Sequence, residues 1–259
     1  MLPDRRKTIN DRQKEDIMKK TSVLTAALSL GICAGMLNVP VFAGTPQENA
    51  SQLLEDVSGK YDELFTVICD PKYDQLWLDD CSAIVGDEAA EAFAEMLKSA
   101  CTGTIYGEEA VSVFGDGSQG MQFDCYFIND VDQFVFDGNH ISGLDENGEE
   151  LFGYDYTYTQ ELSLGGMMDG YLYETDAEDA GEFRYFLMMP DTPESTYHIE
   201  FRYGSDIDAL SRYNEGAYAY WLAAGILADY DEQMVEDVID LFVSENLAET
   251  GEDAETMTE

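Results

Sequence analysis

Residues 196–203 have the sequence Thr196-Tyr197-His198-Ile199-Glu200-Phe201-Arg202-Tyr203, in which polar side chains alternate with apolar or aromatic ones. In a β-strand, successive side chains point to opposite faces of the sheet. The alternation therefore places His198, Glu200 and Arg202 on one face and four apolar or aromatic side chains on the other. This pattern predicts a strand in a sheet that buries an aromatic face.

The same period of two extends back along the chain to about Gly120. Aromatic and β-branched residues alternate there between short turn sequences such as Asp137-Gly138 and Ala180-Gly181. Many short strands in succession are typical of an antiparallel meander that closes into a small barrel. The predicted strands are 121–128, 133–136, 140–142, 150–158, 170–174, 183–189 and 196–203.

Helical periodicity flanks this region on both sides. Apolar residues recur at a spacing of three to four over 53–65 and again over 87–101, which predicts two or three short helices before Gly120. Further helices are predicted over 206–224 and 231–247, the second with a single apolar stripe. The fold class is therefore α+β, with an antiparallel barrel over 120–204, helices in 44–119 and 205–247, and a single domain spanning 44–247. The polar, acidic tail 248–259 is expected to be disordered.

Residues 1–43 predict an N-terminal extension followed by a signal peptide. Lys19 and Lys20 precede an apolar run over 23–37, and Val41-Phe42-Ala43 supplies the small-x-small pattern that signal peptidase cleaves. We expect cleavage near Ala43 and a protein that is secreted or held in the periplasm or elsewhere outside the cytoplasm. The apolar run is short for a membrane span, so none is expected in the mature chain. Lipidation of Cys33 is a less favoured alternative, because lipoprotein signals carry a small residue where this chain has Ile32.

The mature chain is very acidic. Seven of the 13 basic and four of the 54 acidic residues precede Gly44, which leaves 6 basic and 50 acidic groups in 216 residues and a net charge of −44. Binding to a phosphate backbone requires clustered lysines and arginines, so nucleic acid is excluded as a partner. A field of this sign instead concentrates cations near the protein. For most of these carboxylates, solubility outside the cell is a sufficient explanation.

Four cysteines lie beyond the signal, namely Cys69, Cys81, Cys101 and Cys125. An even number in an exported chain predicts two disulfides, with three possible pairings. No Cys-x-x-Cys pair occurs, which argues against a four-cysteine zinc site.

The sequence shows no recognisable catalytic site. Paired carboxylates could serve a carbohydrate hydrolase, but no pair stands out among the 50 acidic residues of the mature chain. The chain has two histidines and lacks the Gly-x-Ser-x-Gly, phosphate-loop, His-Glu-x-x-His and dinucleotide motifs. We therefore predict a binding protein and not an enzyme. On the strand through 196–203, His198 and Glu200 are a plausible pair of ligands for a divalent ion. Alternatively, Glu200 pairs with Arg202 or with a neighbouring strand, and His198 is only hydrogen-bonded in a polar barrel interior. His140 follows a turn and is expected at the surface.

Over residues 130–247 the chain resembles the ZinT (YodA) family of exported zinc-recruiting proteins. The resemblance depends on Tyr154-Asp155-Tyr156, Tyr171-Leu172-Tyr173-Glu174, Arg184-Tyr185, the strand through His198 and the final amphipathic helix. It implies a calycin-like, lipocalin-related barrel and a role in metal scavenging or delivery to an uptake system at the cell surface. In the family, an Asp-His strand end and a His-x-His strand hold the metal.

The resemblance implies a metal site made of Asp191, His198 and Glu200, with water or another carboxylate as the fourth ligand. Only one of the three family histidines is kept. Carboxylates can replace imidazole, so zinc remains the expected ion, with more tolerance of other divalent metals. Protonation of the imidazole is expected to weaken binding below about pH 6. Two alternatives are a barrel that has lost its ion, and a barrel that holds a small apolar ligand in a cavity lined by Tyr154, Tyr156, Tyr171, Tyr173 and Tyr185.

Overall fold

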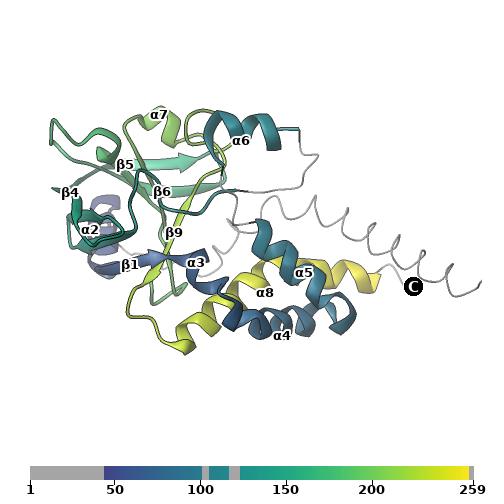
Figure 1. Ribbon diagram of the computed structural model, residues 1–259. Coiled ribbons are helices and arrows are strands. Elements are labelled where there is room, and N and C mark those ends of the chain that lie inside the picture. The colour runs from purple at the N-terminus through teal and green to yellow at the C-terminus, as the bar shows by residue number, and fades with distance from the viewer. Residues whose placement is uncertain (1–43, 101–104, 117–122, 257–259) are drawn as a thin grey trace, which may run out of the picture.

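A nine-stranded antiparallel sheet is the centre of the structure (Figure 1). The computed structural model describes residues 44–100, 105–116 and 123–256, with side chains up to residue 247. The strands are β1 (Gly59–Glu63), β2 (Gln133–Asp137), β3 (His140–Leu144), β4 (Glu150–Asp155), β5 (Thr157–Leu164), β6 (Met168–Glu174), β7 (Tyr185–Met188), β8 (Ile199–Gly204) and β9 (Ala223–Leu227). Their order in the sheet is β4-β3-β2-β1-β9-β8-β7-β6-β5.

The helices complete an α+β fold, as predicted. They are α2 (Pro46–Asp56), α3 (Leu64–Ile68), α4 (Asp74–Val85), α5 (Asp87–Ala100), α6 (Gly107–Phe114), α7 (Ile207–Leu210) and α8 (Glu232–Thr256), with 3-10 turns η2 (Pro71–Tyr73) and η3 (Gly181–Phe183). Figure 1 shows α4, α5 and α8 gathered beside the sheet, and α4 contacts both of the other two.

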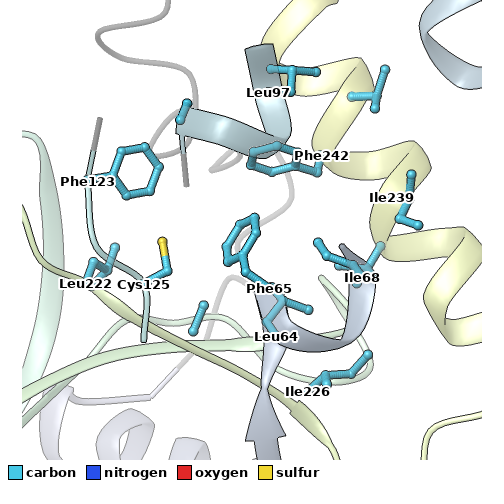
Figure 2. Close-up of a cluster of buried hydrophobic side chains, with 14 of the residues drawn as sticks. Leu64, Phe65, Ile68, Leu97, Phe123, Cys125, Leu222, Ile226, Ile239 and Phe242 are labelled. Carbon is cyan, nitrogen blue, oxygen red and sulfur yellow. The ribbon is translucent and has the colours of Figure 1, made fainter. Parts of the chain in front are cut away.

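Each face of the sheet packs into a separate apolar cluster. Along β8, Ile199, Phe201 and Tyr203 belong to a cluster dominated by aromatic rings, which also receives α2 through Ala50 and Leu53. The other cluster lies between the sheet and the α3, α4, α5 and α8 helices. Figure 2 shows this second cluster, in which Phe65 of α3 meets Phe242 of α8 edge to face with ring centroids 5.6 Å apart. Burial on both faces explains why β8 is buried at every position.

The two edges of the sheet are joined through one residue. Residues 150–158, predicted as one strand, form β4 at one edge and the start of β5 at the other, with Tyr156 between them. Tyr156 is buried, its N–H donates to the Asn139 carbonyl at 2.8 Å, and its hydroxyl donates to the Phe183 carbonyl. Because Asp155 and Thr157 lie at opposite edges, the sheet must curve until the edges meet at this point.

Several sequence predictions are corrected by the structure. Residues 53–65 are not continuously helical, because β1 lies between α2 and α3. Residues 206–224 contain only the short α7 and then enter β9, so the long helix predicted there is wrong. Residues 123–128 make an isolated bridge from Asp124 to Trp221 instead of a strand, and Met121 and Gln122 lie outside the described residues. The strands predicted at 183–189 and 196–203 are shortened to β7 and β8, which begin at Tyr185 and Ile199.

The final helix extends beyond its predicted end. The helix predicted over 231–247 is α8, which continues to Thr256 through most of the tail that was expected to be disordered. The predicted signal peptide and Cys33 lie outside the described residues, so export and cleavage near Ala43 stay predictions. Within the described part of the chain, no helix combines the length and the apolar character needed to cross a membrane.

The cysteines do not form the predicted pair of disulfides. Cys69 and Cys81 carry free thiols, whereas two bridges would require all four cysteines. Both thiols lie among apolar side chains of the helical cluster, and burial raises the pKa of each to about 11. Cys101 lies outside the described residues.

Candidate metal site

The connection between β7 and β8 brings Asp191 toward His198. Met188 pairs with Phe201 across the two strands, and the Met189 N–H donates to the Glu200 carbonyl at 2.9 Å. Beyond this last bond the chain turns back within a few residues, through a 2.9 Å bond from the Thr196 N–H to the Thr192 carbonyl. The two residues therefore stand on opposite arms of one short connection.

The His198 ring is fixed by a backbone carbonyl. Its Nδ1 lies 2.6 Å from the Thr196 carbonyl oxygen, and since a carbonyl can only accept, Nδ1 carries a proton. Nε2 lies 3.6 Å from Glu200 Oε1, and the two side chains are 14% and 8% exposed. A neutral ring held in this way would present its Nε2 lone pair toward the carboxylate, which is the orientation common in histidines that bind metals.

A further carboxylate comes from the last helix and was not predicted. Glu245 of α8 lies within electrostatic range of Asp191, His198 and Glu200. Desolvation raises the pKa of Glu245 to about 7, and the charges of Glu200 and Asp191 add to the rise, whereas His198 opposes it. A sequence signal existed, because Glu245 lies three residues after Phe242 and so interrupts the apolar stripe of the helix.

The carboxylates determine the charge on His198. Desolvation lowers the pKa of His198, but contact with Glu200 and the charge of Asp191 outweigh it and raise the pKa to about 9. The pKa of Asp191 is raised by desolvation and by the charge of Glu200. The ring is therefore an imidazolium at neutral pH, and its positive charge partly balances Glu200 and Asp191.

Arg202 does not neutralise this group of acids. It is fully buried, and its guanidinium donates to the carbonyls of Leu210 (2.6 Å), Arg212 (3.0 Å) and Tyr218. Among the ion pairs of the described residues, none joins Glu200 to Arg202. The alternative in which these two neighbours pair on the strand is wrong.

The donor set suits a borderline divalent ion, although the side chains are not drawn together around a common point. One imidazole nitrogen with carboxylate oxygens is a combination that zinc accepts. As positioned, no three histidine, cysteine, aspartate or glutamate side chains of the described residues form a group able to hold a metal ion. Ion binding would thus require the side chains of these residues to move closer together.

The aromatic face of the sheet is filled by its own side chains. The Phe134 ring lies at the middle of this face and contacts six other rings, with centroid separations from 4.8 Å to 6.3 Å. The Tyr173 hydroxyl is buried and donates to the Ala50 carbonyl at 2.7 Å. Tyr156 and Tyr173, two of the tyrosines expected to line a ligand cavity, are thus core residues.

Comparison with known proteins leaves the family open. The sequence matches no protein-family profile and no curated protein. Two solved structures from Streptococcus pneumoniae are similar in part. The Zn(II)-bound ZinT-like domain of AdcA is 15% identical, with a TM-score of 0.46, over 72% of this chain and 89% of that one. Zn(II)-bound AdcA is 14% identical, with a TM-score of 0.44, and the match covers 73% of this chain and 35% of that one. Both TM-scores lie below the level that establishes a common fold.

Proposed function

We propose that this chain is an exported protein that binds a divalent metal, zinc in first place, as cargo for scavenging or for delivery to an uptake system at the cell surface. Asp191, His198 and Glu200 are the ligands, and Glu245 is the candidate for the additional carboxylate. The curved sheet would be a calycin-like barrel of the ZinT kind. The protein would act by binding and release, without catalysis.

The observation that carries this proposal is the buried imidazole among acids. Nδ1 of His198 is committed to a carbonyl at 2.6 Å, Nε2 faces Glu200, and Asp191 and Glu245 act on the same ring electrostatically. Buried like charges are costly unless a cation compensates them. A divalent ion that replaces the Nε2 proton would add one positive charge to the group and relieve this repulsion.

Metal content and zinc affinity test the proposal directly. The protein, purified without a histidine tag, is titrated with zinc against a chelator of known affinity, beside His198→Ala and the matched control His140→Ala. We expect the unmodified chain and the control to retain one tightly bound zinc and His198→Ala to lose it. If all three proteins bound zinc equally tightly, the assignment of His198 to the zinc site would be wrong.

A further inference from the structure

The other histidine of the chain lies above a glycine on the outermost pair of strands. In the pairing of β3 with β4, His140 stands opposite Asp155 and Ser142 stands opposite Gly153. His140 is therefore the diagonal neighbour of Gly153 across the pair. This surface is open to solvent, since the side chains of His140 and Asp155 are 45% and 76% exposed.

Asp155 fixes the orientation of the His140 ring. Its Oδ1 lies 2.8 Å from His140 Nδ1. A carboxylate oxygen accepts, so the proton is on Nδ1 and the neutral ring presents Nε2 as a free lone pair. A carboxylate on the far nitrogen is a usual way to orient a metal-binding imidazole and to raise its basicity.

Glu150 and His140 converge over the missing side chain of Gly153. A Cβ built at Gly153 would lie 3.1 Å from Glu150 Oε1 and 3.2 Å from His140 Nε2. One oxygen and one nitrogen donor thus flank the same empty point, which only a glycine leaves open. Zinc binds such donors at about 2.0 to 2.2 Å, so small side-chain rotations would let one ion reach both.

The surroundings of this point are acidic. A hollow of about 420 Å³ next to it is lined by His140, Gly153, Asp155, Glu174 and Asp176, among others. Glu174 is paired with Arg184 at 2.7 Å, so Asp155 and Asp176 carry the unbalanced charge. These two carboxylates belong to a chain whose net charge is −41, and the resulting field raises the local concentration of cations.

We propose that His140 Nε2 and the Glu150 carboxylate form a second divalent-cation site on the β3–β4 edge, with Asp155 as a positioning residue. One nitrogen and one carboxylate ligand select borderline ions such as zinc or cobalt(II) over magnesium. Two protein ligands leave the remaining positions to water, so the ion binds weakly and exchanges rapidly. This site shares no residue with the site proposed around His198 and does not depend on it.

Histidine NMR tests the second site separately from the first. The chain has two histidines, so the protein without a tag gives two imidazole Hε1 signals, which His140→Ala and His198→Ala assign. Zinc is added beyond one equivalent, with magnesium as the comparison. We expect the His140 signal to shift progressively with zinc and to be unmoved by magnesium. A His140 signal that zinc leaves unmoved up to millimolar concentration would overturn the proposal, whatever happens to His198.

Two variants test the geometry without removing the histidine. Gly153→Ala places a methyl group between the two ligands; its backbone is compatible with alanine, and the atoms it meets are the ends of flexible side chains, so folding is expected to be unaffected. Asp155→Asn should raise the zinc concentration for half of the His140 shift roughly tenfold. Gly153→Ala should raise this zinc concentration by a similar factor and leave the His198 signal unchanged. An unaltered His140 titration in both folded variants would refute the site.

Discussion

The charge on His198 makes the pH dependence of zinc binding the most informative prediction. Nε2 must lose its proton before a metal can bind there, so apparent affinity falls wherever the metal-free ring is protonated. The neighbouring carboxylates outweigh desolvation and raise the pKa of His198 from its ordinary 6.5 to about 9. The expected loss of binding therefore begins near pH 9, and not near the pH 6 that an ordinary histidine would give.

The magnitude follows from one proton displaced for each ion bound. Below the raised pKa, each pH unit costs about tenfold in affinity, or about 1.4 kcal/mol. Apparent zinc affinity should therefore rise about 30-fold between about pH 7 and pH 8.5. Below about pH 7 the dependence should steepen, because Glu245, whose pKa desolvation raises to about 7, then also takes up a proton.

Competition with a chelator whose own pH dependence is known measures this slope. A logarithmic slope near one above pH 7 is the expected result. An affinity that is flat over that interval would show that the metal-free ring is already neutral, and the electrostatic account of the site would be wrong.

Three further predictions concern the stability of the protein. Glu245→Gln should raise the free energy of unfolding of the metal-free protein by about 1–2 kcal/mol above about pH 7, after allowance for the partial exposure of the carboxylate. A carboxyl group whose pKa rises on folding destabilises the folded state at any pH above its ordinary pKa of 4.5, which gives the sign. The gain in stability should therefore vanish below that pH, as measured by thermal unfolding in the presence of a chelator. A gain that persists there would contradict this prediction. Phe134→Ala should lower the free energy of unfolding, measured in urea, by about 3–5 kcal/mol, because it leaves a cavity in the middle of the aromatic cluster. The control Leu151→Ala, at a side chain that is 44% exposed, should change the free energy of unfolding little. Arg202→Lys should lower the free energy of unfolding by about 3 kcal/mol, because an ammonium group cannot reach the three carbonyls to which the guanidinium donates. A decrease of less than about 1 kcal/mol would contradict this.

Local patterning predicted strands in which polar and apolar residues alternate along the sequence. β2 also alternates in burial, whereas β3 was recognised from His140-Ile141-Ser142 although its three central residues are all buried, and α8 was found from its apolar stripe. β1 was missed because Gly-Lys-Tyr-Asp-Glu buries only Tyr61 and continues the helical spacing of its neighbours. β9 was missed for the opposite reason: Ala-Ala-Gly-Ile-Leu favours a helix and is buried on both faces, so it has no alternation.

The candidate site shows the same limit. His198 and Glu200 are two residues apart, so strand alternation alone placed them on one face. Asp191 came from the family resemblance, and the turn that returns it toward His198 depends on contacts among Thr192, Ser195 and Thr196. Glu245 approaches only because α8 packs against the sheet. Its position on the apolar stripe sets it apart from most other acids, but nothing in the sequence shows that this stripe packs beside His198.

The strand order also constrains how the protein can assemble. β1 is bonded to β2 on one side and to β9 on the other, so Tyr61 pairs with both Phe134 and Leu227. A nascent polypeptide that lacks β9 therefore leaves one side of β1 unpaired and cannot hydrogen-bond the two halves of the sheet to each other at this point. Since α8 follows β9, the same polypeptide also lacks Glu245, and the group of acids around His198 stays incomplete until this last segment has docked.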